Sequence, residues 1–98
     1  MLAEPFKLTD GRTVDIGIDE DDVKAVVKTP AGQDIGCLEF SLRDDPSGDY
    51  LKLVDANMDF IPGYVRKGIG RECVRRMAAH FSLPVATMTA RNRTMEAI

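Results

Sequence analysis

The chain has 98 residues, of which 44% are hydrophobic and 30% charged, and its formal net charge is −3. This length suits one domain with a single core and is too short for two. We find no apolar run near 18 residues and no charged leader before an apolar stretch, so we expect a cytoplasmic protein without a membrane span or signal peptide. A metal site is not expected, because the chain has one histidine and its two cysteines, Cys37 and Cys73, are predicted to be reduced core residues.

The first half of the chain is predicted to form strands. Apolar residues alternate from Phe6 to Ile18 around an Asp10-Gly11 pair, which is typical of a β-hairpin. The acidic run that follows is expected to be a solvated loop rather than a metal site. Two more strands and a turn should come next, over residues 23–28, 35–42 and 44–49.

A long strand is expected over residues 50–61, and it carries polar residues near its end. Alternate side chains of a regular strand share a face, so Asp55, Asn57 and Asp59 should project together just before a glycine-rich turn. They either belong to a site or mark the solvent-facing side of a sheet, and the pattern leaves both interpretations open.

An amphipathic helix is expected over about residues 68–81, because apolar residues recur at helical spacing. Three cations and two glycines gather where it begins: Arg66, Lys67, Gly68, Gly70 and Arg71. A helix N-terminus carries partial positive charge and normally favours acidic residues. Either these cations are simply solvated beside a turn, or they mark a phosphate-like anion bound by backbone amides and side-chain charge.

Charge is distributed unevenly along the sequence. The segment before Tyr64 holds 14 acidic and 6 basic residues, whereas the segment from Tyr64 onward holds 2 acidic and 7 basic ones. Nucleic acid is not expected as the partner, because aromatic residues that would stack on bases do not alternate with these cations. A small polyphosphate ligand fits the basic segment better.

Residues 62–70, Pro-Gly-Tyr-Val-Arg-Lys-Gly-Ile-Gly, resemble the acetyl-CoA-binding segment of the GNAT superfamily of N-acetyltransferases. The family pattern is a strand, a proline, an aromatic residue two positions later, and Arg/Gln-x-x-Gly-x-Gly/Ala opening a helix; Val65 departs from it in the Arg/Gln position. The resemblance implies a minimal α+β acyltransferase-like fold. This would be a mostly antiparallel twisted sheet of about five to six strands with one main helix and a strand–helix–strand crossover.

The same resemblance implies acetyl-CoA or another acyl-CoA as the cofactor, and an amine on a small molecule or protein as the acceptor. The amine would attack the thioester directly, with Asp59 as the first candidate base and Asp55 as the second. The cofactor would contact backbone amides at the turn, and strand amides near Phe60 and Ile61 would hold the oxyanion that forms on the thioester. These predicted cofactor-binding residues are Phe60, Ile61, Val65, Arg66, Lys67, Gly68, Ile69, Gly70 and Arg71.

Residues 84–89 are expected to form a strand parallel to the one before the helix, followed by a polar segment at residues 91–93. The pattern lacks the family's last helix, which carries a tyrosine acid in many members, and the two helices that wall the acceptor site. Two function classes therefore stay open: an acyl-CoA-dependent N-acyltransferase, and a non-catalytic CoA-binding or interaction module. A sheet edge left uncovered by the missing elements would suit a homodimer.

Overall fold

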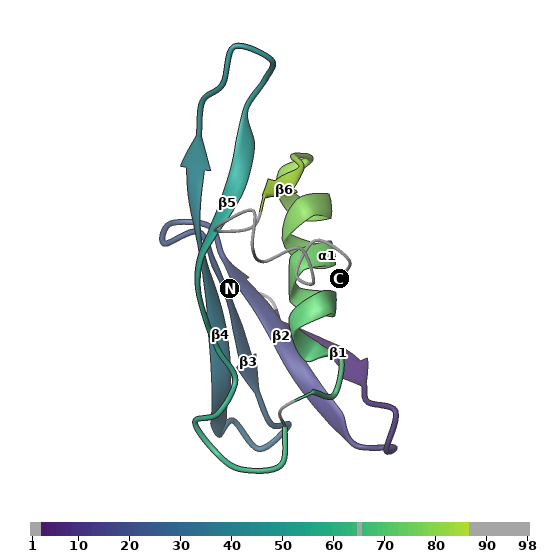
Figure 1. Ribbon diagram of the computed structural model, residues 1–98. Coiled ribbons are helices and arrows are strands. Elements are labelled where there is room, and N and C mark those ends of the chain that lie inside the picture. The colour runs from purple at the N-terminus through teal and green to yellow at the C-terminus, as the bar shows by residue number, and fades with distance from the viewer. Residues whose placement is uncertain (1–2, 65, 87–98) are drawn as a thin grey trace.

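The computed structural model describes residues 3–64 and 66–86, which form a sheet and one helix (Figure 1). The elements are β1 (Ala3–Lys7), β2 (Thr13–Asp19), β3 (Lys24–Lys28), β4 (Asp34–Arg43), β5 (Tyr50–Asn57), α1 (Ile69–Phe81) and β6 (Val85–Ala86). The strands lie side by side in chain order, β1 to β6. Neighbours from β1 to β5 are antiparallel, whereas β5 and β6 are parallel, as a strand–helix–strand connection allows.

The predicted acyltransferase-like α+β fold is wrong. The described residues form a six-stranded sheet that curls into a half-barrel, with a single helix of 13 residues against it (Figure 1). The physical reason is that strands joined in sequence by tight turns make a meander, and strand twist with local bulges curls such a meander on itself. The resembling segment spans a turn and a helix start, so it carries no information on how the sheet curves.

The predicted first hairpin is confirmed. Phe6 pairs with Val14 across β1 and β2, and the Leu8 amide donates to the Arg12 carbonyl at 2.7 Å. Gly11 closes the turn with a positive φ of 94°, a conformation that glycine adopts without steric cost.

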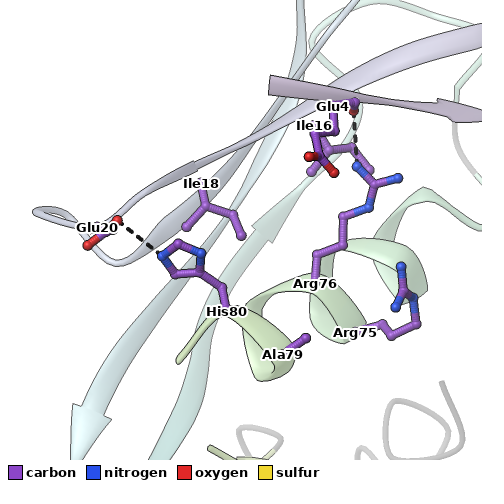
Figure 2. A pocket seen from close by; sticks show the side chains of 8 residues that line it. All are labelled: Glu4, Ile16, Ile18, Glu20, Arg75, Arg76, Ala79 and His80. Carbon is purple, nitrogen blue, oxygen red and sulfur yellow. Dashed lines mark hydrogen bonds and ion pairs between the residues drawn. The ribbon is translucent and has the colours of Figure 1, made fainter. Parts of the chain in front are cut away.

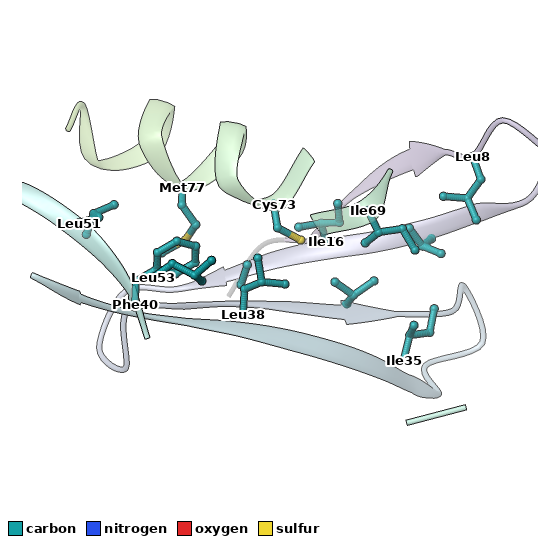
Figure 3. Packing of buried hydrophobic residues seen from close by; sticks show 13 residues of the cluster. Leu8, Ile16, Ile35, Leu38, Phe40, Leu51, Leu53, Ile69, Cys73 and Met77 are labelled. Carbon is teal, nitrogen blue, oxygen red and sulfur yellow. The ribbon is translucent and has the colours of Figure 1, made fainter. Parts of the chain in front are cut away.

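Helix α1 packs its apolar stripe against the sheet (Figure 3). Ile69, Cys73 and Met77 are buried, at the i, i+4, i+8 spacing that the sequence predicted for this face. Their partners in the core come from every strand between β2 and β5 and include Ile16, Leu38, Phe40 and Leu53. Burying such side chains contributes about 1.5–3 kcal/mol each, so the helix is fixed on the sheet mainly by this stripe.

A regular strand would place Asp55 on the same face as the buried Leu51 and Leu53, but a β-bulge in β5 prevents this. Glu39 pairs with Asp55 and Phe40 with Leu53, so Val54 is an extra residue with no partner in β4. Beyond the bulge the alternation shifts by one residue, since opposite residues in a ladder share a face. Asp55 therefore lies beside exposed Glu39, on the sheet face opposite to the core residues.

The strand before α1 is shorter than predicted, and the strand after it is described only in part. β5 ends at Asn57 rather than at residue 61, and the chain then crosses the start of β4 as a loop. β6 is described at residues 85–86 only; the rest of the predicted strand and the polar segment at 91–93 lie outside the described residues. In the described part of the chain, no helix reaches the length and hydrophobicity that a membrane span needs.

Candidate anion-binding site at the start of α1

The first backbone amides of α1 have no acceptor within the helix. Gly68 caps the helix in the left-handed conformation (φ 82°, ψ 5°), and no side chain caps it by a hydrogen bond. The first backbone bond of the helix runs from the Glu72 amide to the Gly68 carbonyl, at 3.2 Å. The amides of Ile69, Gly70 and Arg71 precede that bond, so they have no acceptor within the helix. Three N–H groups at the positive end of a helix dipole are a suitable binding place for an anion.

The Cβ positions of two glycines at the helix start, Gly68 and Gly70, face open space. A Cβ atom built on Gly68 or on Gly70 would meet nothing within 4 Å. Position 68 favours glycine because its φ is positive. Gly70 has an ordinary helical conformation, and no neighbour there would exclude a side chain. A ligand can therefore approach Gly68 and Gly70 from the side on which a Cβ atom would lie.

The three cations at the helix start, Arg66, Lys67 and Arg71, are not paired with acidic side chains in the part of the chain that the structure describes. The acidic residue in the first turn, Glu72, instead pairs with the next turn of its own helix, through Arg75 at 2.6 Å and Arg76 at 2.7 Å. Hydrogen bonds from Arg75, followed by those from Arg76, lower the pKa of Glu72 to about 2. The resulting field at the helix start is positive.

The loop before the turn is fastened to the first hairpin, a contact that the sequence did not reveal. Arg12 donates from Nη2 to the carbonyl oxygen of Gly63 at 2.6 Å, and its guanidinium lies 4.3 Å from the ring centre of Tyr64. The sequence gave no sign of this contact, because Arg12 lies 51 positions before Gly63 and follows a turn, where a charged residue is expected to be solvated.

The predicted residues at the strand end lie in this loop, and one of their amides is already engaged. The Phe60 amide donates to the Ile35 carbonyl at 3.1 Å, so it is not free for a thioester oxygen. The Phe60 side chain is 53% exposed, whereas Ile61 is half-buried and packs against the core. The predicted cofactor-binding residue Val65 lies outside the described residues.

The two candidate bases are placed differently. Asp59 is exposed in the same loop as the turn. Asp55 lies on the opposite face of the sheet, beyond the bulge, where its carboxylate accepts hydrogen bonds at 3.0 Å from the Ala56 amide and from Asn57 Nδ2. The structure therefore does not bring Asp55 together with the start of α1.

A separate groove of about 800 Å³ runs between the second half of α1 and the first hairpin (Figure 2). Its polar side chains bond to groups of the protein itself. His80 contacts Glu20 at 3.2 Å, while Arg76 donates to the carbonyls of Glu4 and Pro5 at 3.0 Å each. These contacts tie the helix to the edge strand, and they make the groove a structural junction rather than the anion site.

Comparison of the chain with protein-family models, with curated proteins and with solved structures gives no match. In the described part of the chain, no group of three or more His, Cys, Asp or Glu side chains is arranged to hold a metal ion. The assignment of function therefore depends on the geometry and charge of the helix start.

Proposed function

We propose that this chain binds acetyl-CoA, or another acyl-CoA, with the pyrophosphate at the start of α1, and transfers the acyl group to an amine. The observation that carries the proposal is the helix start itself: a left-handed Gly68 cap without a side-chain bond, three amides without an acceptor inside the helix, and open space at the Cβ positions of Gly68 and Gly70. Phosphate oxygens satisfy such amides directly. The resemblance of residues 62–70 to an acetyl-CoA-binding segment supports CoA over other phosphates.

The side-chain charges support binding without specifying the ligand. Arg66 and Arg71 are exposed and Lys67 is half-buried, so they add long-range attraction for a polyphosphate. Bidentate recognition would need a guanidinium fixed by other contacts, and none of these three residues has a hydrogen bond to a side chain in the described part of the chain. The backbone amides are therefore the better source of selectivity.

For the transfer step, a neutral amine would attack the carbonyl carbon of the thioester. The C–N bond forms, the C–S bond breaks, and the CoA thiolate leaves and takes a proton from water. The proton lost by the amine goes to a base, for which Asp59 is the candidate in the loop before the turn.

A second candidate function is CoA binding without catalysis. Two observations favour it: the Phe60 amide is occupied by the Ile35 carbonyl, and Asp55 lies on the far side of the sheet. Both groups were predicted to serve the chemical step and neither is needed to hold the pyrophosphate. Mass spectrometry of an amine incubated with acetyl-CoA and the protein separates the two functions, because only the transferase yields an acetylated product.

Binding is tested by an NMR titration with CoA, acetyl-CoA and pyrophosphate, in which the amide signals of residues 66–71 should shift most. Gly70→Glu is the sharpest variant. A carboxylate in the first turn favours the helix, by about 0.5–1 kcal/mol together with the loss of glycine flexibility, yet it occupies the place of the phosphate. Gly70→Glu should therefore be at least as stable as the parent and fail to bind.

The matched control is Ala31→Glu, which adds the same charge at an exposed turn elsewhere and should bind like the parent. A flat titration of the parent up to millimolar ligand would mean that this chain has no such anion site. A Gly70→Glu variant that binds CoA as well as the parent does would place the anion site elsewhere.

A further inference from the structure

We infer that Arg12 is the positioning residue of the proposed CoA site: it fixes the loop that leads into α1, so that the helix-start amides face the ligand. The inference rests on the proposed function. Figure 1 shows the hairpin between β1 and β2 reaching toward the start of α1, where the loop after β5 arrives. Arg12, at the end of this hairpin turn, makes side-chain contacts both within the hairpin and with that loop.

The guanidinium of Arg12 is held in a fixed orientation by the hairpin. Its Nε and Nη2 donate to Asp10 Oδ2 at 2.9 and 2.7 Å, while the backbone amide of Arg12 donates to Asp10 Oδ1 at 3.0 Å. The Arg12 carbonyl in turn accepts from the Leu8 amide. A planar group bound in this way cannot rotate freely, so whatever else it contacts is also placed.

The same guanidinium also contacts two adjacent residues of the loop, and its Nη2 is shared between Asp10 and Gly63. It donates to the Gly63 carbonyl at 2.6 Å and stacks on the Tyr64 ring at 4.3 Å. These contacts combine a charge-assisted hydrogen bond with a cation–π interaction, and both depend on the flat shape of the arginine head. Gly68, which caps α1, follows only four residues after Tyr64, so fixing this point limits where the helix start can lie.

The same pair also controls the charge near the site. Hydrogen bonds from Arg12 are the main reason that the pKa of Asp10 lies below its usual value, and the charge of Lys67 acts in the same direction. Asp10 is therefore close enough to Lys67 to feel the cations of the turn. Without Arg12, the Asp10 carboxylate would lose its ion-pair partner.

The inference is tested with Arg12→Ala and Arg12→Lys, and with Arg43→Ala as the matched control. Arg43 also forms a side-chain hydrogen bond two residues away, to Ser41 at 3.0 Å, but it lies in the opposite hairpin. Amide hydrogen exchange of the free protein should rise about tenfold at residues 72–74, the first hydrogen-bonded amides of α1, in both Arg12 variants, while exchange in β3 and β4 stays as in the parent. Lysine should fail to restore protection, because it keeps the charge but loses the fork and the stacking surface.

Affinity for CoA and for pyrophosphate should fall about tenfold in both Arg12 variants and remain unchanged in Arg43→Ala. Unchanged exchange at residues 72–74 in Arg12→Ala, or a parent-like affinity in either variant, would overturn the positioning role. Full rescue by lysine would also overturn it, since it would reduce Arg12 to a point charge. A parent that binds neither CoA nor pyrophosphate is a different failure: it shows in the parent's own titration, and it overturns the proposed function together with this inference.

Discussion

Gly36 gives the most direct test of how the chain crosses from β5 to the proposed site. This residue lies buried in β4, where the chain leaving β5 passes directly over it. A Cβ atom built on Gly36 would overlap the carbonyl oxygen of Asn57 and come within 2.7 Å of the Met58 Cα and 2.9 Å of its Sδ. Two of these three atoms belong to the backbone, so a side-chain rotation cannot relieve the clash.

We therefore expect Gly36→Ala to destabilise the fold. Inserting one methyl group into a packed site costs about 1–3 kcal/mol, and the backbone contacts place this site at the upper end of that range. Alanine in place of glycine in a strand recovers about 0.5–1 kcal/mol of that cost through the lower entropy of the unfolded chain. The net loss should be about 2 kcal/mol, which corresponds to a fall in Tm of about 8–16 °C for a domain of this size.

The measurement is urea unfolding followed by circular dichroism, with thermal melts as a second readout. Gly70→Ala is the matched control, because a Cβ atom there meets nothing within 4 Å and the helix gains from alanine. This control should be as stable as the parent or slightly more stable. A Gly36→Ala variant with parental stability would show that Asn57 and Met58 do not press on β4 in solution, and the path from β5 to the helix start would have to be redrawn.

Three further outcomes are expected. Lys67→Ala and Arg71→Ala should each weaken CoA binding by about 0.5–2 kcal/mol at low salt and by less at high salt, because their charges attract the phosphates through solvent; losses that do not change with salt in calorimetric titrations would contradict this. The pKa of Glu72 is lowered from 4.5 to about 2 in the folded state, so its contribution to stability is present above pH 4.5 and is lost as the pH falls toward about 2. In urea unfolding across that range, the parent should lose about 1–2 kcal/mol more than Glu72→Gln, and parallel pH profiles would refute the pairing. Acetyl transfer, followed by mass spectrometry, should rise with pH and be largely lost in Asp59→Asn while Asp55→Asn retains it; equal activity of both variants would mean that neither carboxylate is the base.

The sequence predicted the elements whose determinants are local. Apolar residues at helical spacing indicated α1, and the residues buried in it are those of the predicted stripe, such as Cys73 and Met77. The Asp10-Gly11 pair likewise indicated the first hairpin, since two adjacent residues of this kind favour a hairpin turn. In both cases the residues that determine the element lie close together in the sequence.

The bulge and the curl of the sheet could not be predicted in this way. Val54 is an ordinary strand residue by composition, and its lack of a partner depends on how Glu39 and Phe40 pair with the opposite strand. That register difference of one residue places Asp55 on the face opposite to Leu53, although Asn57 still lies beside it as predicted. Contacts between distant segments, such as that of Arg12 with Gly63, could not be predicted either, because they depend on how the whole chain folds.

The wrong fold prediction bears unequally on the two halves of the proposed function. Phosphate binding needs a few amides at a helix start with glycine at the cap, and that arrangement is complete within residues 66–71 whatever sheet lies beneath it. Acyl transfer needs more, because an acceptor amine and a base must be held within bonding distance of the thioester, and that geometry depends on the whole fold. The bulge in β5 places Asp55 on the face of the sheet away from α1, so one predicted base cannot take part in this geometry. Binding of CoA is therefore the part of the proposal to test first, and Asp59 is where the chemistry would have to be found.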